Sequence, residues 1–149
     1  MRTTLGLAER LLLPAVLAAS VLAGCSARAE YIERADAWRG QGIESYLWTL
    51  EASEPVFGPR RTTVHVAHGQ PVRATAEGRR VPIVDGSAND MPATVEALFV
   101  LLIDGAGDAI SVDVRWSETG YPSRIRIDQS DAIDDEVTYR VIRFETLES

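Results

Sequence analysis

The chain contains a single cysteine, Cys25, which stands at the end of an apolar run beginning at Leu11. Arg2 and Arg10 precede this run, and small residues close it. A basic start, a short apolar segment and small residues at its end are typical of a secretory signal peptide. The run is shorter than the roughly 20 apolar residues that a membrane-spanning helix needs. We therefore expect residues 1–24 to be removed, and the rest of the chain to fold without a disulfide.

The run closes with four residues that resemble the bacterial lipobox, namely Leu22, Ala23, Gly24 and Cys25. The resemblance implies cleavage between Gly24 and Cys25 and attachment of acyl chains such as palmitate to the cysteine, because a thiol is a strong nucleophile. Two or more acyl chains hold a protein stably at a membrane. We expect a lipid-anchored protein of the bacterial cell envelope that faces the periplasm or the exterior, with residues 25–29 as a short tether. An ordinary signal peptide with an incidental cysteine, or an uncleaved anchor, are the alternatives.

The charge of the chain excludes one class of partner. The net charge is −7, with 22 acidic residues, and all 15 basic residues are arginines. The phosphates of nucleic acids repel an acidic domain, so we expect no nucleic-acid partner. Residues 30–149 suffice for one domain with its own hydrophobic core.

Two segments, residues 29–39 and 91–108, carry apolar residues at the spacing of an amphipathic helix. The expected apolar face of the first helix is formed by Tyr31, Ile32, Ala35 and Trp38. Thr94 is placed to cap the second helix, and Glu96 follows in its first turn, where a negative charge suits the helix dipole. Glycines are expected to end both helices, because they adopt left-handed conformations readily. These glycines are Gly40, Gly42, Gly105 and Gly107.

Alternation of apolar and polar residues predicts six strands. They fall within residues 44–51, 62–67, 70–76, 109–116, 123–128 and 136–144. Pro82 restricts residues 79–84 to an edge strand, because proline cannot donate a backbone hydrogen bond, and residues 85–90 are expected to be a loop. Short turns between consecutive strands predict an antiparallel meander. The predicted fold is α+β, with an N-terminal and a central helix packed on one sheet face and the other face partly exposed to water.

Five stretches of the sequence together resemble an uncharacterised bacterial family, domain of unknown function 6174. They read GIESYLWTLE, VHVAHGQPV, TVEALF, GYPSRIRID and AIDDEVTYRVIRF. The resemblance implies an extracytoplasmic location and a single α+β domain, but no reaction, because the family has no assigned activity. Many relatives look as if they carry a Cys-x-Cys pair after the first strand, where this chain reads SEPVFGPR. Any role of that pair is therefore absent here.

A cluster of acidic residues lies before the last predicted strand, and its oxygens are of the type that calcium prefers. The cluster consists of Asp128, Asp131, Asp134, Asp135 and Glu136. Its spacing does not match an EF-hand loop. We favour the simpler interpretation of a solvated loop whose charges pair with arginines of the flanking strands, each pair contributing roughly 0–1 kcal/mol. Those arginines are Arg124, Arg126, Arg140 and Arg143.

The two histidines, His65 and His68, are three residues apart and should point to opposite faces of a strand, so they do not predict a metal site. Five aromatic residues lie on or beside predicted strands, where core packing is the favoured interpretation and an exposed binding patch the alternative. They are Tyr46, Trp48, Trp116, Tyr121 and Tyr139.

No sequence motif for catalysis or cofactor binding emerges. The chain lacks a Gly-x-Ser-x-Gly elbow, a His-Glu-x-x-His helix and a Cys-x-x-Cys pair. We expect a non-catalytic binding or interaction module with no cofactor, whose partner is an envelope protein or a glycan. An envelope hydrolase and a calcium-dependent structural lipoprotein are the alternatives.

Overall fold

The computed structural model describes residues 13–109, 111–130 and 136–148, with the backbone alone for residues 13–26 and 108. Within these residues the chain forms two helices and two antiparallel sheets. The helices are α1 (Leu13–Gly40) and α2 (Val95–Asp108). The larger sheet comprises β1 (Tyr46–Glu54), β2 (Gly58–Ala67), β3 (Gln70–Ala76), β4 (Arg79–Val81), β8 (Ser111–Trp116), β9 (Pro122–Asp128) and β10 (Glu136–Thr146). The smaller sheet comprises β5 (Ile83–Val84), β6 (Ser87–Ala88) and β7 (Met91–Pro92).

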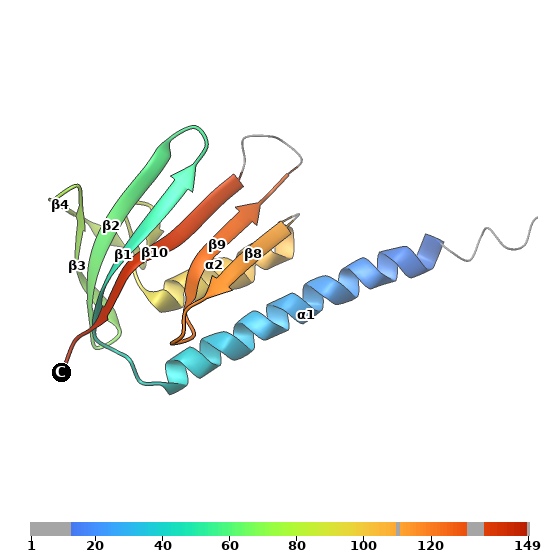
Figure 1. Ribbon diagram of the computed structural model, residues 1–149, viewed down its shortest axis with the longest axis horizontal. Coiled ribbons are helices and arrows are strands. Elements are labelled where there is room, and N and C mark those ends of the chain that lie inside the picture. Colours follow the sequence, from blue (N-terminus) through green and yellow to red (C-terminus); the bar gives the residue numbers. More distant parts are fainter. Residues whose placement is uncertain (1–12, 110, 131–135, 149) are drawn as a thin grey trace, which may run out of the picture.

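The seven strands of the larger sheet follow the order β4-β3-β2-β1-β10-β9-β8. The predicted α+β fold with an antiparallel sheet and two packed helices is confirmed. The sheet consists of two meanders, β1 to β4 and β8 to β10, rather than one. The strands β1 and β10 join them as antiparallel neighbours in the middle of the sheet (Figure 1).

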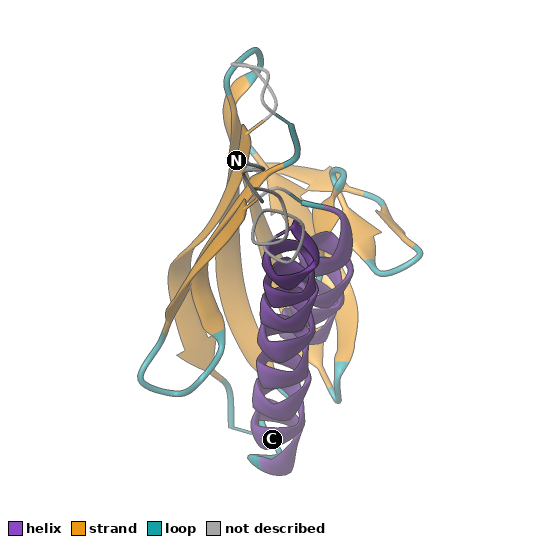
Figure 2. Ribbon diagram, turned by 90° about the vertical axis from the view of Figure 1, so that its right-hand side faces the viewer, coloured by secondary structure: helices purple, strands orange, loops and turns teal. Residues whose placement is uncertain are grey.

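The hydrophobic core lies between the helices and one face of the larger sheet. Figure 2 shows α1 and α2 on the same side of the curved sheet. Every second residue of β1 is buried against the helices, because side chains alternate between the two faces of a strand. Its buried residues on this face are Tyr46, Trp48, Leu50 and Ala52. From α2 the core receives Val95, Leu98, Phe99 and Leu102.

Helix α1 ends at Gly40, as the glycine predicts, but it begins at Leu13. Residues 25–29, which we expected to form a tether, are therefore helical, and the Gly24–Cys25 bond lies inside the helix. The apolar face was predicted partly wrongly, because the side chain of Ile32 is 45% exposed while Tyr31, Ala35 and Trp38 are buried. Among the described residues, no helix combines the length and the apolar character needed to cross a membrane.

The predicted N-cap of α2 is confirmed, since the Thr94 side chain accepts a hydrogen bond from the backbone N–H of Ala97 at 3.1 Å. The helix ends at Asp108, the last residue of the predicted segment, but the role predicted for the glycines was wrong, because Gly105 and Gly107 lie inside the helix. A Cβ atom at Gly105 would lie 3.2 Å from Cδ1 of Ile127 in β9. The missing side chain thus lets α2 approach the sheet closely.

The segment after β3 was also predicted incorrectly in part. Pro82 divides the expected edge strand into β4 of the larger sheet and β5 of the smaller sheet. Residues 85–90, expected to be a loop, contain β6 between two tight turns. Both central residues of each turn have positive φ, which matches the right-handed twist of a hairpin. These residues are Asp85 and Gly86 in one turn, and Asn89 and Asp90 in the other.

Candidate functional site

The larger sheet has one face that carries neither helix. We call this surface the open face. On β1 it presents Leu47, Thr49, Glu51 and Ser53, which alternate with the buried residues of the core. Polar and charged side chains predominate on it, and two hollows lie there. Side chains on the open face point to solvent, so they are accessible to a ligand.

A row of five charged residues crosses the open face on five neighbouring strands. Antiparallel register places Arg115 of β8 opposite Arg124 of β9, and Arg124 opposite Arg140 of β10. It continues from Arg140 to Glu51 of β1, and from Glu51 to Arg61 of β2. We call these residues the arginine row. Side chains directly opposite each other in a sheet are nearest neighbours, so the row places four guanidinium groups and one carboxylate in a line across the five strands.

Glu51 is the single acid of the arginine row, and two arginines hold it. Arg61 donates from Nε to Oε2 of Glu51 at 2.6 Å, and Arg140 donates from Nη2 to Oε1 at 2.8 Å. The hydrogen bond from Arg61, supported by Arg140, lowers the pKa of the Glu51 carboxyl despite its desolvation. The carboxylate is only 9% exposed, whereas the two arginine side chains are 64% and 55% exposed. Glu51 therefore remains charged beneath its partners.

The larger hollow of the open face, about 550 Å³, lies over the arginine row. It is lined by Glu51, Ser53, Arg115, Ser123, Arg124, Thr138, Arg140 and Val141. Unlike Arg140, the guanidinium groups of Arg115 and Arg124 form no ion pair or hydrogen bond within the described part of the chain. The hollow therefore contains positive charge that no acidic side chain of the described residues neutralises.

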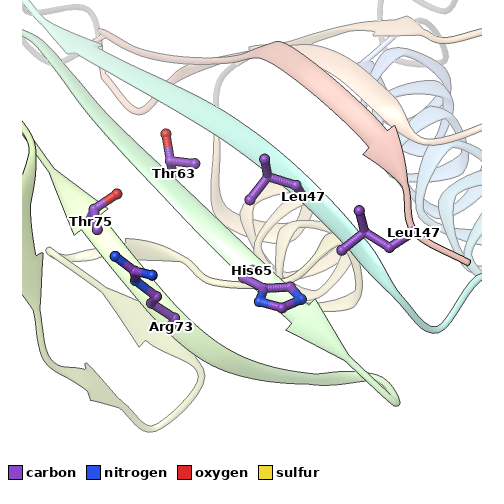
Figure 3. Close-up of a pocket in the computed structure, with 6 residues that line it drawn as sticks. All are labelled: Leu47, Thr63, His65, Arg73, Thr75 and Leu147. Carbon is purple, nitrogen blue, oxygen red and sulfur yellow. The ribbon is translucent and has the colours of Figure 1, made fainter. Parts of the chain in front are cut away.

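The smaller hollow, about 240 Å³, lies on β1, β2 and β3 beside the end of β10 (Figure 3). Its lining residues are Leu47, Thr63, His65, Arg73, Thr75 and Leu147. The side chains of His65 and Arg73 come from paired positions of β2 and β3. His68 lies apart from them in the β2–β3 turn with φ of 52°, so the two histidines do not share a site. This lining supplies a cation and hydroxyl groups but no carboxylate.

The acidic cluster lies largely outside the described residues, because Asp131, Asp134 and Asp135 belong to that gap. Its two ends, Asp128 and Glu136, are partners across β9 and β10. Among the described residues, no group of three or more histidine, cysteine, aspartate or glutamate side chains is placed to hold a metal ion.

The ion pairs that we expected around the acidic cluster form only in part. Arg126 donates to Glu136, whereas Arg140 binds Glu51 and Arg143 binds Glu145. Arg124 has no acidic partner among the described residues. The arginines of β9 and β10 thus do not form one group around the loop. No pattern in the sequence indicates that Glu51, on a distant strand, pairs with Arg140.

The five aromatic residues pack in or against the core, which confirms the favoured interpretation. Tyr46 accepts a hydrogen bond from the backbone N–H of Val95 at 2.9 Å, and Trp48 donates to the carbonyl of Ala93 at 3.1 Å. Burial raises the pKa of the Tyr46 hydroxyl. These groups fix the start of α2 on the sheet, and they do not form an exposed binding patch.

Comparison with known protein families matches residues 30–146 to a family of unknown function, DUF6174. The chain belongs to this family. The match covers both meanders of the sheet, helix α2 and the part of α1 that packs on the core. No curated protein matches the chain. Membership in DUF6174 thus confirms the domain that the sequence stretches indicated and assigns it no activity.

Proposed function

We propose that the protein is a lipid-anchored protein of the bacterial cell envelope whose domain binds a ligand on the open face without catalysing a reaction. The observation that carries the binding role is the larger hollow, where two guanidinium groups of the arginine row have no acidic partner among the residues that the structure describes. Arg115 is exposed and Arg124 half-buried. Guanidinium groups that line a hollow and have no acidic partner of their own are suited to hold an anion there.

The anchoring role rests on the lipobox resemblance at residues 22–25. The distance along α1 is consistent with it: Tyr31, the first buried residue among the described side chains, lies six positions after Cys25. At a helical rise of 1.5 Å per residue, this places the core about 9 Å from the acylated position. The domain would then sit next to the membrane surface, where it can meet partners in the envelope.

A hydrolase receives less support from the open face. Acyl transfer by a hydroxyl needs a base that is itself oriented by a further group. His65 has two threonines in its hollow but no carboxylate among the lining residues. A calcium-dependent role receives no support from the described ends of the acidic cluster, because Glu136 is already engaged by Arg126.

Metabolic labelling tests the anchor. The full chain and a Cys25→Ser variant are expressed in a bacterium that processes lipoproteins, in the presence of an alkyne-tagged palmitate. We expect the unaltered chain to incorporate the label and to fractionate with membranes, and the Cys25→Ser variant to do neither. A Ser26→Ala variant serves as the control and should behave like the unaltered chain. An unaltered chain that carries no fatty acid would refute the anchoring part of the proposal.

A further inference from the structure

Three arginines of the arginine row stand side by side on adjacent strands, which is an unfavourable arrangement. Like charges directly opposite each other destabilise a sheet. The chain is acidic overall, with 22 acidic residues, yet the only acid in the row is Glu51. Glu51 is occupied by Arg61 and Arg140, which leaves Arg115 and Arg124 facing each other. The row therefore holds a net charge of three positive units from four arginines and one glutamate.

Neighbouring arginines on the same strands are neutralised, which makes the row distinct. Arg126, two residues along β9 from Arg124, pairs with Glu136 and also faces Asp113 across the strand pair. Arg143 on β10 pairs with Glu145. An arginine on an edge strand such as β8 can also serve to prevent aggregation. That explanation does not extend to Arg124, because β9 is an internal strand.

Hydroxyl groups complete the hollow. Ser53 and Thr138 are partners across β1 and β10, and within the described residues neither side chain forms a hydrogen bond. Both line the hollow, and both hydroxyls can donate a hydrogen bond to an oxygen atom bound there. The hollow thus offers several hydrogen-bond donors for an oxyanion.

We propose that the larger hollow binds the phosphate group of a phosphate ester, held between Arg115 and Arg124. This proposal deepens the binding role proposed above and rests on it. A phosphate monoester carries about −1.5 to −2 charges at pH 7, which matches two unpaired guanidinium groups better than the single charge of a carboxylate does. Guanidinium groups bind phosphate oxygens in a planar, bidentate fashion. A hollow of about 550 Å³ exceeds the size of the phosphate alone, and it leaves room for the esterified group.

Binding of glycerol 3-phosphate to the full-length Cys25→Ser variant tests the proposal independently of lipid attachment. Line broadening of the ³¹P resonances and the rise in melting temperature are measured in a buffer free of phosphate. We expect saturable binding that weakens as the sodium chloride concentration rises. The double variant Arg115→Gln/Arg124→Gln should bind at least about tenfold more weakly, because charge-assisted hydrogen bonds are lost.

The matched control is Arg79→Gln/Arg80→Gln, which removes the same charge from β4 at the opposite edge of the sheet. This variant should retain the affinity of the parent chain. An equal loss in both double variants would indicate general electrostatic attraction and overturn the proposal. The absence of saturable binding when glycerol 3-phosphate is in 10-fold molar excess over millimolar protein would also overturn it. So would binding of a glutamate-rich peptide as tightly as glycerol 3-phosphate. Should the Arg115/Arg124 variant fail to fold, Ser53→Ala combined with Thr138→Val replaces it, with the same expected direction.

Discussion

The two faces of the larger sheet differ in the interactions that their side chains make. The covered face is built from large apolar and aromatic side chains whose polar atoms bond to the start of α2, as in Trp48 and Tyr46. The residues that alternate with them along β1 point to the open face, where Glu51 forms ion pairs with two arginines. Because most of the buried apolar surface lies on the covered face, most of the folding free energy comes from that face. The open face can therefore carry charges that do not favour folding.

The largest effect is expected from a substitution on the covered face. Trp48→Ala should lower the free energy of unfolding by about 3–5 kcal/mol, because it creates a cavity and leaves the carbonyl of Ala93 without its donor. Leu47→Ala, at the adjacent position on the open face, should cost about 1 kcal/mol or less. Urea unfolding followed by tryptophan fluorescence and circular dichroism measures both. Equal losses in the two variants would contradict the division between the faces.

The next effect concerns the charge at the centre of the arginine row. Glu51→Gln should lower the free energy of unfolding at pH 7 by about 1–2 kcal/mol, because Arg61 and Arg140 lose a charged acceptor. The folded-state pKa of Glu51 lies below its unfolded value. Its contribution is therefore fully present above the unfolded pKa of about 4.3 and is lost as the pH falls through the lower folded value. Urea titrations from pH 7 to pH 3 should show the two proteins converging in stability.

Glu145→Gln is the control for this pH dependence. Glu145 also pairs with an arginine, Arg143, but both side chains are more than half exposed. Exposed pairs contribute little. This variant should track the parent chain at every pH, and a loss as large as that of Glu51→Gln would show that burial of the carboxylate is not what matters.

The smallest effect is expected to have the opposite sign. Arg124→Gln should raise the free energy of unfolding by about 0.2–0.5 kcal/mol, since it removes a like charge that faces Arg115 and Arg140. The gain should shrink at high salt. Arg126→Gln, on the same strand, should instead destabilise the domain, because Arg126 has an acidic partner. Thermal unfolding at low and high salt compares them, and a loss of stability in Arg124→Gln would show that an unrecognised contact holds this arginine.

Local patterns in the sequence predicted the strands and the cap of α2 well. Alternation along β1 identified Tyr46, Trp48 and Leu50 as core residues, and Thr94 announced the start of a helix. Alternation also placed Glu51 on the outer face, but it could not show that two arginines would cover it. These arginines come from positions 10 and 89 residues away, and register between distant strands depends on tertiary packing.

Other errors have equally local causes. Gly105 was interpreted as a helix terminator, whereas its lack of a side chain serves the contact with Ile127. Sequence alone does not distinguish a glycine that ends a helix from one that permits close packing. The turn at Asp85 and Gly86 did carry a hairpin signal, an Asp-Gly pair directly after the apolar Ile83 and Val84, and it could have indicated the smaller sheet.

The pairing of β1 with β10 has a consequence for folding kinetics. Each meander can form from contacts between neighbours in the sequence, but the two can join only when the final strand of the sheet becomes available. Closing that long separation is entropically costly, so we expect a slow assembly step. Until that step, β1 and β10 each expose an unpaired edge. A chain that emerges gradually from a ribosome or a translocation channel would therefore stay incompletely folded until almost all of it had passed.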